Sequence, residues 1–115
     1  MPTIARRGDV VLVRFPFTDL TSAKLRPAVV LATHSRDLII VGVFSSLPQT
    51  RELTWIPLGS EDPTFPQTGL RASSIIKAVR IAVVEQSVVV RKLGALTSAQ
   101  MNALTIAVKL ALNLD

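Results

Sequence analysis

Short β-branched runs alternate with turn-forming residues along most of the chain, and this pattern restricts it to a mainly β fold. The runs occupy residues 10–15, 27–31, 38–44, 52–58, 74–84 and 87–93. Such runs, bounded by Gly, Pro, Asn, Asp or Ser, predict strands, except that residues 87–93 fit either a shorter strand or a turn of 3₁₀ helix. Residues 38–44 are apolar almost throughout, which predicts a strand buried on both faces, whereas the prolines and glycines of 59–69 predict a loop. Successive short strands followed by one helix predict a small antiparallel β-barrel with a packed C-terminal helix.

The C-terminal segment changes to helical spacing. Thr97 and Gln100 match a capping box at its start, and residues 99–114 follow the period of an α-helix. Its polar residues form one narrow stripe, made of Ser98, Asn102, Thr105, Lys109 and Asn113. A surface helix usually has a wider polar face. We therefore expect the sheet to cover one side of this helix and a partner subunit to cover another.

The chain has 115 residues and shows no repeat or linker, which predicts one domain over residues 1–115. About half of the residues are apolar (49%), more than one small core usually needs, so a subunit interface is expected. No apolar run reaches the roughly 18 residues of a membrane helix, and no signal peptide is recognisable. These features favour a cytoplasmic protein.

The net charge of +5 favours an anionic partner, nucleic acid first, although a basic protein without such a partner fits the charge as well. The absence of cysteine excludes disulfides and thiolate metal sites. With one histidine and scattered carboxylates, we expect no bound metal and no cofactor. The lone His34 lies in a predicted turn, and it excludes a two-histidine acid–base mechanism within one chain.

Arginines and hydroxyl groups are the remaining candidates for chemistry, and they gather at the ends of predicted strands. Arg26 precedes Pro27, so its backbone is expected to be extended, and Ser45 ends the third run. Arg71 and Ser73 open the fifth run. Guanidinium groups and hydroxyls suit phosphate oxygens, and RNA cleaves itself when a 2′-hydroxyl attacks the adjacent phosphate. Each residue taken singly also fits an ordinary surface or turn position, so convergence on one patch is the decisive expectation.

Two segments resemble the start of the MazF/PemK family of toxins. A Gly8-Asp9 strand leads through a loop into the Arg26-Pro27 strand, and this combination at this spacing covers residues 8–31. Phe44-Ser45-Ser46 and residues 69–77 are similar to later family segments in the same order, as is the terminal helix. The likeness extends over nearly the whole chain and is strong over residues 8–31.

The resemblance implies an SH3-like barrel of the CcdB/MazF/PemK type that forms a homodimer partly through its C-terminal helix. It implies a toxin of a type II toxin–antitoxin system that inhibits translation and growth. The implied activity is metal-independent, sequence-specific cleavage of single-stranded RNA, leaving a 2′,3′-cyclic phosphate and a 5′-hydroxyl. The implied partners are single-stranded mRNA and a cognate antitoxin that blocks the RNA groove.

Carried over by position, the resemblance implies catalytic roles for Arg26, Ser45 and Arg71. It implies RNA binding by Thr18, Lys24, Ser46, Ser73, Ser74 and Lys77. Some members use an aspartate as general base where this chain has Ser73, and a serine cannot replace that aspartate at neutral pH. The general base is therefore left unassigned by the sequence, and an inactive homologue stays open.

Two alternative functions follow from the same fold. A CcdB-like toxin binds gyrase through the terminal helix, which the apolar residues of 103–114 would fit. A non-catalytic RNA-binding homologue would use the basic groove alone, with binding that falls steeply with salt. The low aromatic content (4%) argues against a stacking platform for bases.

Overall fold

The computed structural model describes residues 4–14, 24–45 and 51–114, and they form one antiparallel sheet with a C-terminal helix. The strands are β1 Asp9–Arg14, β2 Leu25–His34, β3 Asp37–Phe44, β4 Trp55–Leu58, β5 Ser74–Glu85 and β6 Val89–Ala95. The helices are α1 Phe65–Thr68, the 3₁₀ turn η1 Gln86–Val88, and α2 Ser98–Ala111. The mainly β fold class expected from the strand pattern is confirmed.

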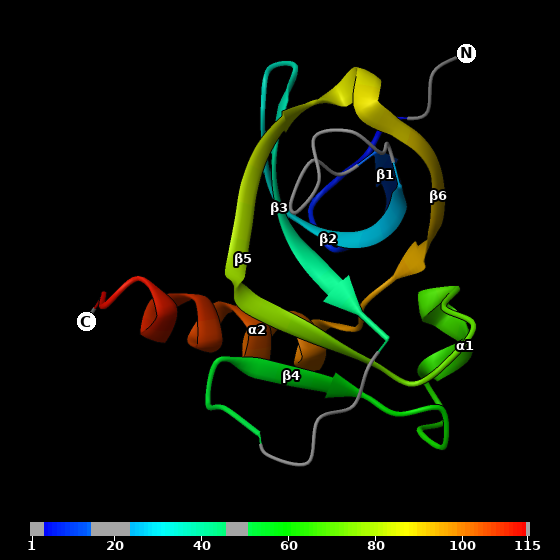
Figure 1. Cartoon of the computed structure of the whole chain (residues 1–115), viewed down its shortest axis with the longest axis vertical. Coiled ribbons are helices and arrows are strands. Elements are labelled where there is room, and N and C mark those ends of the chain that lie inside the picture. The colour runs from blue at the N-terminus through cyan, green and yellow to red at the C-terminus, as the bar shows by residue number, and fades with distance from the viewer. Residues whose placement is uncertain (1–3, 15–23, 46–50, 115) are drawn as a thin grey trace.

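The sheet order is β4-β5-β3-β2-β1-β6, and the sheet is not closed. In Figure 1, β5, η1 and β6 bend around β1, β2 and β3, so the sheet curls strongly. Its edges are β4 and β6. Among the described strands β4 pairs only with β5, and its Pro57 has no amide hydrogen for a further ladder, so β4 is an edge of the described sheet.

Three sequence predictions are refined by local structure. The predicted strand 52–58 begins only at Trp55, because the Trp55 amide donates to the Glu52 carbonyl and closes a turn. The segment 87–93, predicted as a short strand or a 3₁₀ turn, contains both, because the 3₁₀ turn η1 leads directly into β6. The predicted loop 59–69 contains the single-turn helix α1, which its many turn-formers concealed.

The two faces of the curled sheet carry two separate apolar clusters, because successive side chains of a strand point to opposite faces. One cluster contains Val29 and Val41 and packs under Leu104 of α2. The other contains Val30 and Ile40 and lies on the opposite face. Strand β3 contributes to both, which confirms that it is buried on both sides.

Helix α2 begins with the predicted capping box: the Gln100 amide donates to the Thr97 hydroxyl, and the Thr97 amide donates to the Gln100 side chain. Met101, Leu104 and Ala107 are buried against the sheet. Several apolar side chains on the rest of the helix are exposed, notably Ile106 (62%). Within one chain the sheet therefore covers only one side of α2.

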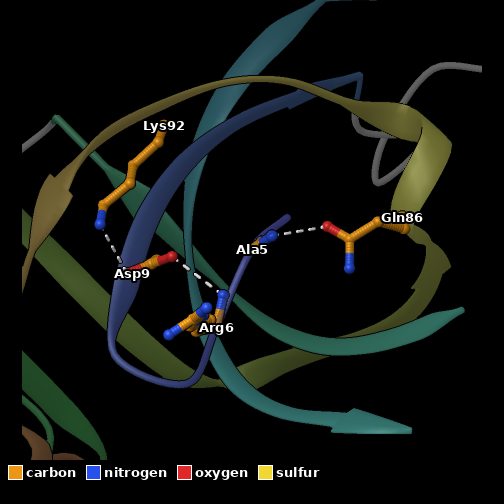
Figure 2. A network of polar contacts seen from close by, with 5 residues as sticks. All are labelled: Ala5, Arg6, Asp9, Gln86 and Lys92. Carbon is orange, nitrogen blue, oxygen red and sulfur yellow. Dashed lines mark hydrogen bonds and ion pairs between the residues drawn. The ribbon is translucent and has the colours of Figure 1, made fainter. Parts of the chain in front are cut away.

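The N-terminal segment is tied down beside β1 and β6 by a small polar network (Figure 2). The buried carboxylate of Asp9 accepts from the Arg6 amide at 2.9 Å and pairs with the Lys92 ammonium at 3.2 Å. The Ala5 amide donates to the Gln86 side chain at 2.8 Å. These bonds hold the buried Ala5 side chain against the cluster that contains Val30.

We expect Asp9→Ala to lower the free energy of unfolding by about 1–3 kcal/mol, because it leaves a part-buried amide at Arg6 without its acceptor. Lys92→Ala is the matched control, and we expect it to cost about 1 kcal/mol or less, since the Lys92 side chain is half exposed. Urea denaturation of both variants measures the difference. Equal effects would show that the ion pair, and not the amide bond, is what Asp9 contributes.

Candidate RNA-binding site

An open hollow of about 340 Å³ lies where β2 begins and β3 ends. Its lining includes three of the sequence-predicted residues, Ser45, Arg71 and Ser74, together with Arg91 of β6. The remaining lining residues are small or apolar: Leu12, Pro27, Gly69, Leu70, Ala72 and Leu93. The hollow thus has two guanidinium groups, two hydroxyls and an apolar floor.

The strand register fixes the arrangement of this floor. Leu12 of β1 lies opposite Pro27 of β2 on one side and opposite Arg91 of β6 on the other. Ser45 directly follows β3, the strand that pairs with β2. Ser45 and Arg91 therefore come from strands at the two sides of the hollow, with the apolar residues of β1 and β2 between them.

Arg71 is brought to the hollow by close packing of α1 on β6. Gly69 ends α1 with a positive φ of 71°, and a Cβ there would collide with the backbone of Leu93. A Cβ on Gly94 would likewise collide with the backbone of Gln67. The buried Thr68 hydroxyl donates to the Phe65 carbonyl and accepts from the Leu70 amide. The two glycines therefore let the α1 segment lie directly on the strand that carries Arg91.

Arg26 is not among the residues that line the hollow, although its neighbour Pro27 is. Adjacent strand residues point to opposite faces, so Arg26 projects to the other face of β2. There its guanidinium carbon lies 6.0 Å from the centroid of the Phe44 ring, and Phe44 is the last residue of β3. Arg26 thus reaches the same end of the sheet as Ser45, from the opposite face.

Lys77 of β5 continues the row that Arg26 and Phe44 begin. Its ammonium lies 4.8 Å from the Phe44 ring centroid and 5.0 Å from the centroid of Trp55 on β4. A cation within about 6 Å of an aromatic centroid is attracted to the ring. Cations and aromatic rings therefore alternate in this row across four strands. The sequence did not predict that Phe44 and Trp55 take part in the site.

Ser73 lies in a second hollow, lined by Arg51, Glu61 and Asp62 among others, and Ser74 borders both hollows. The Ser73 hydroxyl accepts from the Ser60 amide at 2.8 Å and donates to the Ser60 hydroxyl at 3.0 Å. Two carboxylates therefore line the hollow that contains Ser73, the residue found here where some members of the family have an aspartate.

The two carboxylates differ in their environment. The Thr64 amide and the Thr64 hydroxyl each donate a hydrogen bond to Asp62 at 2.8 Å. Both bonds hold the pKa of this exposed carboxyl below its ordinary value, and the bond from the amide has the larger effect. Asp62 is thus a weaker proton acceptor than an aspartate without these two bonds.

The structure brings Ser45, Arg71 and Ser74 together, gathers Arg26 and Lys77 around Phe44, and separates Ser73 from both groups. Lys24 is exposed immediately before β2. Thr18 and Ser46 lie outside the described residues. Arg91 was missed by sequence reasoning, and its only signal was a positive charge interrupting the apolar run 87–93.

Within the described ranges, no three His, Asp or Glu side chains gather closely enough to hold a metal ion. Among the same residues, no helix is long and apolar enough to cross a membrane.

Comparison with known proteins agrees with the fold and identifies the family. The model of the family described as "PemK-like, MazF-like toxin of type II toxin-antitoxin system" matches residues 6–112. No curated protein matches the chain by sequence. Many solved structures resemble it, but those named below share less than 25% sequence identity, so they support the fold alone.

Three of these structures illustrate the similarity. An endoribonuclease from a mycobacterial species, in complex with its cognate antitoxin, has a TM-score of 0.73 and 22% identity, covering 97% of this chain and 98% of that one. The Mycobacterium tuberculosis toxin MazF-mt6 has a TM-score of 0.72 and 18% identity, covering 93% and 98%. MazF from Deinococcus radiodurans has a TM-score of 0.74 and 15% identity, covering 97% and 99%. Because the family model spans nearly the whole chain, the protein belongs to the PemK-like, MazF-like toxins of type II toxin–antitoxin systems.

Proposed function

We propose that the protein is an endoribonuclease toxin that cleaves single-stranded RNA without a metal ion and so stops translation in the cytoplasm. The observation that carries this proposal is the hollow in which Ser45, Arg71 and Ser74 meet at the open end of the sheet. Arg26 adds a further guanidinium at the same end, from the neighbouring strand. Similar structures named endoribonucleases support the reaction class.

The chemistry asked of these groups is modest. The 2′-hydroxyl of a ribose attacks the adjacent phosphorus, the bond to the 5′-oxygen breaks, and a 2′,3′-cyclic phosphate and a 5′-hydroxyl result. The protein has to align this attack and stabilise the added negative charge on the phosphate. Arg26, Ser45 and Arg71 are suited to donate hydrogen bonds to the phosphate oxygens when the phosphate lies over the ends of β2 and β3. We assign the protonation of the leaving 5′-oxygen to Arg26.

The 2′-hydroxyl proton needs an acceptor, and Ser73 cannot supply one near neutral pH. Glu61 lines the hollow next to the one that holds Ser45, with Ser74 on the boundary. Its neighbour Asp62 is made less basic by Thr64. We therefore favour Glu61 as the proton acceptor.

We further propose that the protein forms a homodimer through the uncovered side of α2. Ile106 is 62% exposed and Leu110 is 50% exposed. Exposed apolar side chains grouped on one helix are typical of an interface. The cognate antitoxin is proposed as a second partner, in line with toxin–antitoxin complexes among the similar structures.

We expect Ile106→Lys to shift the protein from dimer to monomer, because it places a charge in the centre of the proposed contact. Light scattering coupled to size exclusion measures the mass directly. Ser87→Lys is the control, since it adds the same charge at an exposed residue of η1, away from α2 (Figure 1). A wild-type mass of one chain at micromolar concentration would overturn the dimer.

The function is tested by incubating purified protein with a long single-stranded RNA in the presence of EDTA. We expect discrete cleavage products. Intact RNA together with inhibited DNA supercoiling would instead indicate a gyrase-binding toxin that uses α2. Intact RNA that is nevertheless bound, with affinity falling steeply as salt rises, would indicate a non-catalytic RNA-binding protein.

A further inference from the structure

Arg91 has no role in the reaction proposed above, yet it faces the same hollow as Ser45 and Arg71. It lies on the edge strand β6, exposed to solvent, and β1 and β2 separate it from the end of β3 that carries Ser45. If the reacting phosphate is bound near Ser45, Arg91 is free to contact a neighbouring part of the same RNA.

The floor between these two residues is apolar. Leu12 and Pro27 lie on adjacent strands in direct register, and Leu93 also lines the hollow. Such a surface has nothing to offer a phosphate or a ribose hydroxyl, but it can pack against the flat face of a nucleobase. The volume of about 340 Å³ lies at the lower end of the range for small-ligand pockets, roughly 300–1,000 Å³.

The polar groups at the rim select among the four bases. An arginine side chain donates hydrogen bonds and accepts none. Guanine presents two adjacent acceptors, O6 and N7, which a guanidinium contacts in a bidentate manner. Adenine and cytosine each present an amino donor at the corresponding edge, and uracil presents one acceptor. In single-stranded RNA the bases are free to be splayed out in this way.

We infer that this hollow is a nucleobase subsite that prefers guanine, and that Arg91 is the residue that reads its edge. The base packs on Leu12 and Pro27, and the Arg91 guanidinium contacts O6 and N7. This inference rests on the proposal that the hollow receives single-stranded RNA. It adds that the sequence preference of the protein depends on a residue of β6 that takes no part in the chemical step.

Binding of short uncleavable RNAs tests this directly. The probes are two fluorescent 2′-O-methyl hexanucleotides of uridine, one with a single guanine and one with a single adenine in its place. We expect wild-type protein to bind the guanine probe about tenfold more tightly or better. Arg91→Gln should bring this ratio close to one, and Arg91→Lys, which keeps the charge without the fork, should lower it similarly.

Arg36→Gln is the matched control, because Arg36 is exposed in the β2–β3 turn, at the opposite end of those strands from Ser45. It removes one positive charge and should leave the ratio unchanged. Equal wild-type affinities for the two probes would overturn the inference. A uniform loss of affinity for both probes in Arg91→Gln would also overturn it, because that is the behaviour of a phosphate contact.

These outcomes separate the inference from the proposed function, since the probes cannot be cleaved. Cleavage of natural RNA with no guanine preference in binding would support the ribonuclease activity and contradict the guanine subsite. A guanine preference that depends on Arg91, with natural RNA left intact, would support the guanine subsite and contradict the ribonuclease activity.

Discussion

Arg26→Ala is expected to lower the rate of RNA cleavage by about 100- to 1,000-fold, the range observed when one preorganised donor to a developing oxyanion is removed. Arg26 is the second residue of β2 and lies beside the end of β3, where it approaches a phosphate from the face opposite Ser45. The measurement is the single-turnover cleavage rate of a short RNA with saturating protein, which separates the chemical step from binding.

Two further variants make this result interpretable. Arg26→Lys keeps the charge but loses the planar fork, and it should recover only part of the activity. Arg36→Ala removes a charge from the far turn and should leave the rate near that of the wild type. Loss of the contact with Phe44 should cost about 1 kcal/mol or less of unfolding free energy, so Arg26→Ala remains folded. A cleavage rate for Arg26→Ala within fivefold of the wild-type rate would show that Arg26 has no catalytic role.

Gly94→Ala is expected to lower the stability of the fold strongly. The added methyl group would collide with the Gln67 carbonyl, and backbone of α1 or β6 has to move to admit it. Overpacking of this kind costs about 1–3 kcal/mol. The movement also carries Arg71 away from Arg91, so we expect lower RNA affinity together with a lower melting temperature, both measured on the same preparation.

Gly59→Ala is the matched control for this prediction. A methyl group there would meet only the carboxylate end of the Glu61 side chain, which can rotate away. Since the φ angle of Gly59 is not in the left-handed region, alanine fits its backbone. We expect an unchanged or slightly higher melting temperature for Gly59→Ala. Equal losses of melting temperature in the two variants would mean that the collision with the Gln67 carbonyl is not what destabilises Gly94→Ala.

The sequence predicted the strands and the terminal helix because their signals are local. The β-branched run 38–44 and the Thr97–Gln100 capping box depend only on neighbouring residues, and both predictions are confirmed. The openness of the sheet was not predictable in this way, because it depends on which strands pair. Helix α1 was hidden because a single turn of four residues has too little periodicity to recognise.

The candidate site was predictable only in part, for a different reason. Strand ends indicated Ser45 and Arg71, and the structure places both in one hollow. Whether Arg26 shares that hollow depends on the face to which one strand residue points, and a shift of one residue reverses that face. Arg91 comes from an edge strand late in the chain, and only the pairing of β1 with β6 brings it near residues of β2.

The identity of the product ends on one defined RNA is the most direct test of a self-cleaving phosphodiester held by guanidinium and hydroxyl groups. Mass spectrometry of the fragments should show a 2′,3′-cyclic phosphate on one side of each cut and a 5′-hydroxyl on the other. Replacing the ribose at the cut with 2′-deoxyribose should abolish cleavage there. Fragments that carry a 5′-phosphate, or cleavage that persists at the deoxy position, would contradict this mechanism.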